Sequence, residues 1–104
     1  MNGILDESPL DNLDKVLENH IRLIIMLILN SQGWVGFKKL MRILNIGYGR
    51  LATQLKKLEE VNYIEVKKEF VDRKPVTTQR ITTSGKLALE NHLNELKQLI
   101  EICE

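Results

Sequence analysis

The fold is decided by residues 37–89, which read FKKLMRILNIGYGRLATQLKKLEEVNYIEVKKEFVDRKPVTTQRITTSGKLAL. The first half of this stretch has apolar residues at helical spacing in two separate runs. The run over 37–44 predicts a two-turn helix, and the run over about 48–61 predicts a longer one. Asn45 tolerates the left-handed backbone conformation, so we expect the first helix to end there, before a short turn.

The second half of the stretch changes to a period of two. Residues 63–70 alternate between apolar and polar side chains, which indicates a half-buried strand, and residues 76–81 indicate a second strand. A charged loop over 71–75 is expected between them, because Pro75 is tolerated only at the start or edge of a strand. The pattern therefore predicts a hairpin whose tip is Asp72-Arg73-Lys74.

Two long helices are predicted to flank this unit. From Leu13 to about residue 30 the apolar residues fall at helical spacing, and beyond Arg22 they occupy nearly every face. Since one small domain covers only part of such a helix, a second chain is expected on the rest. The last helix begins at Thr82 or Thr83, and its apolar residues follow the spacing of a coiled-coil seam. The residues predicted at the interface of a homodimer are Leu17, Ile21, Ile24, Leu89, Leu93, Leu96, Ile100 and Cys103.

The length of 104 residues suits one domain with one hydrophobic core. We expect residues 1–10 to form a flexible tail and residues 11–104 to form a single domain, with dimerisation helices over about 11–30 and 83–103. The longest apolar run, 23–29, is far shorter than the roughly 20 residues that span a bilayer. The acidic amino terminus does not resemble a signal peptide. These features favour a cytoplasmic protein without a membrane partner.

Several kinds of chemistry are not supported by the residues. Cys103 is the one cysteine, which argues against an intrachain disulfide and a cysteine-cluster metal site. No nucleophile, base and orienting acid occur at usable spacing, and no glycine-rich phosphate loop is visible. We therefore expect neither an enzyme nor a bound metal or cofactor. Trp34, between two glycine-containing turns, is expected to anchor the core.

The formal net charge of +1 hides a strong asymmetry along the chain. Residues 1–35 have five acidic and two basic groups, and residues 87–104 have four acidic and one basic, so each segment carries −3. Residues 36–86 have twelve basic and five acidic groups and carry +7. If the middle segment folds onto one side, it forms a surface that attracts a polyanion.

The quoted stretch resembles the winged-helix transcriptional regulators of the MarR and ArsR superfamily. It is most similar to small archaeal-type members whose wing reads F-V-x-R-K-P-x-T-T, and the preceding HIRLIIMLIL is similar to the family's first helix. The resemblance covers about residues 14–98. It implies an α+β, mostly α fold, a winged helix-turn-helix with a two-stranded wing hairpin and flanking dimerisation helices. It also implies a homodimer that binds double-stranded DNA and regulates transcription.

The same resemblance bears on small ligands. ArsR-type metal sensors carry a Cys-x-Cys pair or His and Asp ligands, and one cysteine with two separated histidines does not match that pattern. MarR-like relatives often bind small phenolic effectors between the dimerisation and DNA-binding parts. No residue of this sequence specifies such an effector, so the sequence leaves a small-molecule effector open.

The residues expected to contact DNA follow from the predicted helix over 48–61. Leu51, Leu55 and Leu58 define its buried side, and the opposite side is polar and basic. Arg50 and Gln54 can pair with base edges, whereas lysines more often reach phosphates. The exposed hairpin tip is expected to contact a minor groove or phosphates. The predicted DNA contacts are Lys38, Lys39, Tyr48, Gly49, Arg50, Thr53, Gln54, Lys56, Lys57, Arg73 and Lys74.

The sequence thus favours a homodimeric, sequence-specific regulator that binds double-stranded DNA. Its two recognition helices would enter successive major grooves about 34 Å apart, so the operator should be a pseudo-palindrome. Two alternatives remain open: a non-specific architectural DNA-binding protein, and a winged-helix protein-interaction module that binds no nucleic acid. Weak sequence preference would favour the first alternative, and no binding at low salt would favour the second.

Overall fold

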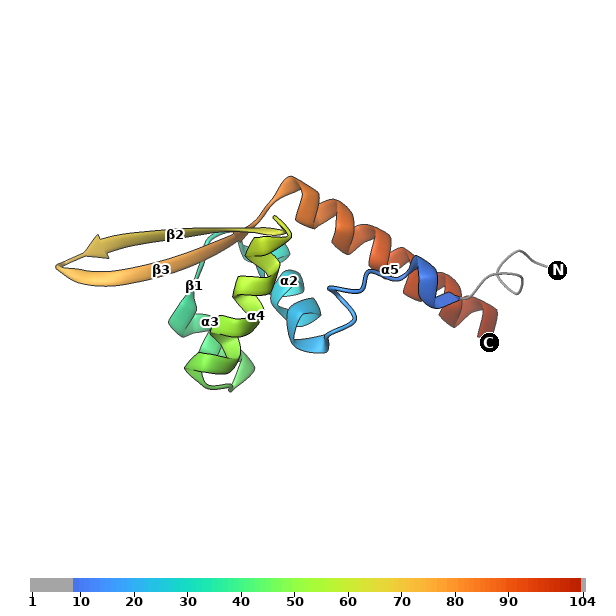
Figure 1. The fold of residues 1–104 in the computed structure, drawn as a ribbon, viewed down its shortest axis with the longest axis horizontal. Helices are drawn as coiled ribbons and strands as arrows, with labels where there is room; N and C mark the ends of the chain where they lie inside the picture. The colour runs from blue at the N-terminus through green and yellow to red at the C-terminus, as the bar shows by residue number, and fades with distance from the viewer. Residues whose placement is uncertain (1–8, 104) are drawn as a thin grey trace.

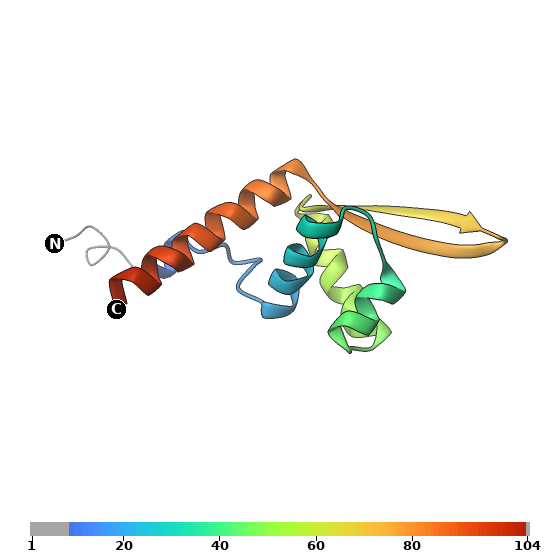
Figure 2. The same ribbon diagram turned by 180° about the vertical axis from the view of Figure 1, so that it is seen from behind.

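Three helices form a body from which a hairpin wing and a long C-terminal helix extend in opposite directions (Figures 1 and 2). The structure is a computed structural model and describes residues 9–103. The fold is a mostly helical α+β winged helix, as the sequence predicts. Its elements are the 3-10 helix η1 (Pro9–Asn12), α2 (His20–Gln32), β1 (Val35–Gly36), α3 (Phe37–Leu44), α4 (Tyr48–Glu60), β2 (Ile64–Val71), β3 (Lys74–Ile81) and α5 (Thr83–Cys103).

The three strands form one antiparallel sheet in the order β1-β3-β2. Gln79 on β3 lies opposite Val66 on β2 and Val35 on β1, and Phe70 lies opposite Pro75 near the end of the hairpin. The register therefore extends the ladder almost to the tip of the wing.

The wing is longer than the predicted loop over 71–75 allows. β2 continues to Val71 and β3 begins at Lys74, so only Asp72 and Arg73 form the turn. Both have positive φ, 51° and 66°, as in the two-residue turns whose twist matches that of paired strands. Pro75 is tolerated within β3 because β1 pairs with β3 only at Thr78 and Gln79, which leaves that edge of β3 open near the tip.

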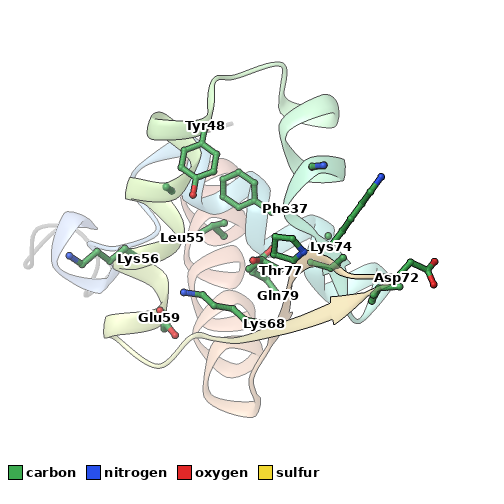
Figure 3. A pocket seen from close by; sticks show the side chains of 16 residues that line it. Phe37, Tyr48, Leu55, Lys56, Glu59, Lys68, Asp72, Lys74, Thr77 and Gln79 are labelled. Carbon is green, nitrogen blue, oxygen red and sulfur yellow. The ribbon is translucent and has the colours of Figure 1, made fainter.

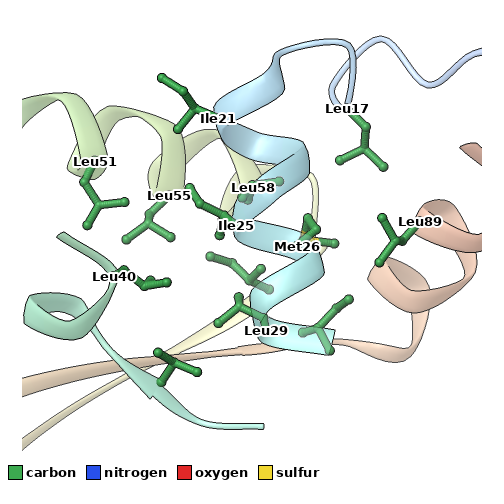
Figure 4. Close-up of a cluster of buried hydrophobic side chains, with 13 residues drawn as sticks. Leu17, Ile21, Ile25, Met26, Leu29, Leu40, Leu51, Leu55, Leu58 and Leu89 are labelled. Atoms are coloured by element: carbon green, nitrogen blue, oxygen red, sulfur yellow. The ribbon is translucent and has the colours of Figure 1, made fainter. Parts of the chain in front are cut away.

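The core is centred on α2, whose side chains contact the other helices and the sheet (Figure 4). Ile25, Met26 and Leu29 on α2 are fully buried, and leucines from α3, α4 and α5 pack around them. The remaining buried apolar side chains of this cluster are Leu17, Ile21, Val35, Leu40, Leu51, Leu55, Leu58, Ile64, Ile81 and Leu89.

The first long helix begins seven residues later than its apolar spacing predicts. α2 starts at His20, and residues 14–18 form turns instead of continuing the helix from Leu13. Asn19 caps α2, because its side-chain oxygen accepts the backbone N–H groups of Ile21 and Arg22 at 2.9 and 3.1 Å. Asp14 Oδ1 accepts backbone N–H groups in the same way within the turns. Short polar side chains that bond nearby amides compete with a helix, so the prediction of a helix over about 11–30 is wrong for the residues before His20.

A polar network ties this N-terminal segment to the rest of the fold. The Tyr63 hydroxyl donates to Asp14 Oδ2 at 2.5 Å, and the Asp14 backbone N–H donates to Nδ1 of His92, which is 3% exposed. Burial, and next the hydrogen bond to Asp14 and its negative charge, raise the pKa of Tyr63 from 10.0 to about 12. The network joins the segment before α2 to the start of β2 and to α5.

No helix within residues 9–103 is long and apolar enough to cross a membrane. In the same range, no group of three or more His, Cys, Asp or Glu side chains is placed to hold a metal ion.

Candidate nucleic-acid interface

The outer side of α4 is exposed and basic. Leu51, Leu55 and Leu58 point into the core, which turns the opposite side of the helix to solvent. No acidic side chain lies in the first turn of α4. The predicted contact residues that are exposed on this helix are Tyr48, Gly49, Arg50, Thr53, Lys56 and Lys57.

The start of α4 is open to the surroundings. Gly47 is the N-cap in an extended conformation, and no side chain caps the helix. A Cβ atom added at Gly47 or Gly49 would meet nothing within 4 Å. Tyr48 is 70% exposed and its ring lies 4.8 Å from the ring of Phe37, at 47° to it. The backbone amides of the first turn are therefore accessible beside an aromatic pair.

Two predicted contact residues of α4 already have hydrogen-bond partners within the chain. The Arg22 guanidinium donates to the side-chain oxygen of Gln54 at 2.8 Å, which holds Gln54, a half-buried residue, toward α2. The Thr53 hydroxyl donates to the Gly49 carbonyl at 2.9 Å. Direct pairing of Gln54 with an adenine would compete with this bond to Arg22.

The cations of α3 and of the wing flank α4. Lys38 and Lys39 are exposed on α3, and Lys39 Nζ donates to the Gln32 side chain at 3.0 Å. Arg73 occupies the second turn position at the wing tip and Lys74 begins β3, both exposed. Apart from the half-buried Gln54, the predicted contact residues are thus exposed on α3, α4 and the end of the wing.

A hollow of about 650 Å³ separates the wing from α3 and α4, and Figure 3 shows the side chains around it. Its walls are Phe37 and Tyr48 on one side and the strand residues Lys68 and Thr77 on the other. Gln79, only 1% exposed, also lines it, and its side-chain oxygen has no hydrogen-bond partner in the described part of the chain. The remaining lining residues are Gly36, Lys38, Ala52, Leu55, Lys56, Glu59, Val71, Asp72, Lys74, Pro75 and Val76.

Among the four lysines that line the hollow, Lys68 is the one that the sequence prediction missed. It projects from β2 into the hollow (Figure 3), whereas the neighbouring Lys67 lies on the other face of the strand. Alternation along β2 could have separated the two lysines, because residues one apart point to opposite faces of a sheet. The sequence lacked the information on which face turns toward α4.

The prediction that Trp34 anchors the core is wrong. Trp34 is 36% exposed and its ring lies against two cations of the outer face of the wing, with Lys67 Nζ at 4.4 Å and the Arg80 guanidinium at 4.6 Å from the ring centre. Arg80 also pairs with Glu65 at 2.9 Å, and Lys67 with Glu69 at 3.6 Å. Part of the positive charge of residues 36–86 therefore lies away from α4.

The residues predicted at a homodimer interface fall into two groups. Leu17, Ile21 and Leu89 are buried in the core of the chain itself, so their side chains do not face outward, contrary to their assignment to an interface. Helical spacing assigns these three residues to an apolar side of a helix, but it cannot show whether the same chain or a second chain covers that side. Ile24, Leu93, Ile100 and Cys103 are exposed, and Leu96 is half-buried.

Comparisons with known proteins agree with this architecture. Residues 21–100 match the winged helix DNA-binding domain family. An uncharacterized protein of Methanocaldococcus jannaschii is 33% identical over 85 residues, covering 82% of this chain and 92% of that protein. A transcriptional regulator homologue from Pyrococcus horikoshii has 27% identity and a TM-score of 0.86, covering 94% of this chain and 99% of that one. A MarR mutant from E. coli complexed with operator DNA, 17% identical, shares the fold with a TM-score of 0.66 over 95% of this chain and 76% of its own.

Proposed function

We propose that this chain, which belongs to the winged helix DNA-binding domain family, is a homodimeric transcriptional regulator that binds double-stranded DNA sequence-specifically. The observation that carries the proposal is the basic, exposed side of α4 beside a basic wing. Such a surface would attract the phosphates of duplex DNA, whose major groove admits one α-helix.

The proposed mode of binding assigns a groove to each element. α4 enters the major groove with Arg50 toward base edges, and the tip of the wing enters the neighbouring minor groove with Arg73. The DNA strand that separates these two grooves then passes over the hollow between α4 and the wing. Lysines on both sides of the hollow, Lys56 and Lys68 among them, are placed to contact its phosphates.

The homodimer is supported by apolar side chains that the chain itself leaves uncovered. Ile24 and Leu27 are exposed on α2, and Leu93, Ile100 and Ile102 are exposed on α5. Covering these side chains would gain the free energy of burial, and a two-fold axis would place two copies of α4 on one pseudo-palindromic site. A cytoplasmic location belongs to the same proposal.

Selection of bound sequences from a random DNA pool tests the proposal. We expect one pseudo-palindromic motif to emerge, and Arg50→Ala to weaken binding to it by about 1–3 kcal/mol and to relax the preference at one position of each half-site. Arg80→Ala is the matched control, because it removes an exposed arginine from the outer face of the wing, where the guanidinium contacts Trp34.

Each other outcome has a distinct meaning. Enrichment of no motif, with binding equal on all competitors, would indicate an architectural DNA-binding protein. No binding even at low salt would indicate a protein-interaction module. Loss of affinity in Arg80→Ala equal to that in Arg50→Ala would contradict the assignment of α4 as the reading helix.

A further inference from the structure

The end of the wing carries an apolar surface that the described residues do not cover. Phe70 is 80% exposed, the largest exposed fraction among the large apolar side chains of residues 10–103. Its ladder partner is Pro75, which is also exposed. Residues directly opposite each other on antiparallel strands share one face, so the two side chains form a Phe70–Pro75 pair. An aromatic ring left in water forgoes the free energy of burial, which points to an external partner.

The Phe70–Pro75 pair faces the same side as the hollow. Alternation along the ladder places it on one face with the pairs Lys68–Thr77 and Val66–Gln79. Lys68, Thr77, Gln79 and Pro75 of this face line the hollow between the wing and α4, and Phe70 lies opposite Pro75, outside the lining. The phenyl ring therefore faces the side of the wing along which the DNA strand of the proposed complex passes.

The position of Phe70 along the strand sets its depth in a groove. Phe70 precedes the first turn residue, Asp72, by two positions, which at about 3.4 Å per residue places it about 7 Å behind the tip. The minor groove of B-DNA is about 7.5 Å deep. With Arg73 at the floor of the groove, the ring of Phe70 is level with the backbone at the rim and not with the stacked bases.

We propose that the Phe70–Pro75 pair packs against deoxyribose rings of the DNA strand that runs between the wing and α4. This inference rests on the proposed DNA-binding function and adds a contact that salt does not screen. The sugar offers apolar C–H groups at the height of the ring, while Lys68 and Lys74 around it supply the phosphate contacts. A wedge between base pairs would need the ring at the turn itself, where Asp72 and Arg73 lie.

The test measures affinity of the full chain for its selected DNA over a series of salt concentrations. Phe70→Ala is expected to bind about tenfold more weakly at every salt concentration, because it removes apolar burial. The slope of log affinity against log salt is expected to stay that of the unaltered protein, whereas Arg73→Ala is expected to reduce the slope by about 1. Phe70→Leu keeps most of the apolar surface and is expected to restore most of the affinity.

Other results would overturn the inference. Equal affinity of Phe70→Ala and the unaltered chain would show that the ring contacts no DNA. A change of slope in Phe70→Ala would indicate an electrostatic role. Loss of DNA bending in Phe70→Ala, measured by energy transfer between dyes at the two DNA ends, would show a wedge between bases instead of a contact at the rim. Absence of DNA binding by the unaltered chain would refute the proposed function itself, which separates that failure from failure of the sugar contact.

Discussion

At the residue scale, Gly85 shows how one missing side chain sets the position of a helix. Gly85 lies in the first turn of α5 and is buried. A Cβ atom there would collide with the Tyr63 backbone carbonyl and would lie 3.0 Å from both Ile81 Cγ1 and Met26 Cε. A backbone carbonyl cannot move aside as a flexible side chain can. The close approach of α5 to the start of β2 therefore requires glycine.

Gly85→Ala is expected to destabilise the fold by about 1–3 kcal/mol, because the added methyl group overpacks the junction. The measurement is the free energy of unfolding from urea denaturation. Gly49→Ala is the matched control: it too lies in the first turn of a helix, but its Cβ meets open space. The higher helix propensity of alanine should leave that variant equally or slightly more stable, by up to about 1 kcal/mol. Equal stability of the two variants would contradict the close approach at Gly85.

Residue-level contacts also limit how far the candidate site could be predicted. The buried leucines of α4 identify its exposed side from sequence, and Arg50, Lys56 and Lys57 lie there. The bond between Arg22 and Gln54 could not be predicted, because the two residues are 32 positions apart and their meeting depends on how α2 packs on α4. The exposed position of Trp34 could not be predicted for a similar reason, since its cationic neighbours Lys67 and Arg80 are distant in sequence and meet it only through strand pairing.

At the element scale, α2 begins where a side chain accepts hydrogen bonds from the first backbone N–H groups of the helix. Asn19 accepts two backbone N–H groups that have no partner within the helix. Asn19→Ala is expected to lower the free energy of unfolding by about 0.5–2 kcal/mol, measured by thermal or urea denaturation. Asn19→Asp keeps the acceptor and is expected to retain most of the stability. If alanine and aspartate behaved alike, capping by Asn19 would not stabilise α2.

The elements differ in how well the sequence predicts them. The period of the apolar residues predicts α3, α4, α5 and the presence of the hairpin, because each has a buried stripe of regular spacing. The spacing of apolar residues cannot show where polar side chains accept hydrogen bonds from backbone N–H groups, so the predicted start of α2 is too early. Nor could it show that a two-residue turn at Asp72–Arg73 lets the strands pair beyond the expected loop.

At the scale of the whole molecule, the chain is elongated, 62 × 26 × 21 Å, with the wing and the end of α5 at opposite ends (Figure 1). Ile100 and Ile102, two of the uncovered apolar side chains of α5, lie near the C-terminal end of the helix, away from the wing. A partner chain that covers them would leave both wings free. The shape is therefore compatible with a dimer that presents two DNA-contacting surfaces.

Ile100→Lys is expected to convert the proposed dimer largely to a monomer, because it places a charge in the proposed apolar interface. The measurement is the molar mass in solution, from light scattering coupled to size-exclusion chromatography. Leu87→Lys is the matched control, since Leu87 is also exposed on α5 but lies on the opposite side of the helix from Leu93, Leu96 and Ile100, at 3.6 residues per turn. An unaltered chain of monomeric mass at high concentration would contradict the dimer.

Arg22 has a consequence for how such a molecule behaves. From α2 its Nε donates to the Val16 carbonyl at 2.6 Å, and its Nη1 donates to Gln54 on α4, so one side chain spans the segment before α2 and both helices. If α2 is displaced when a second chain associates, Arg22 would transmit that displacement to α4. If association of two chains raises their affinity for the operator by some factor, thermodynamic linkage requires that the bound operator raise the affinity of the two chains for each other by the same factor. We therefore expect operator DNA to promote assembly: chains too dilute to pair in free solution would pair on its two half-sites.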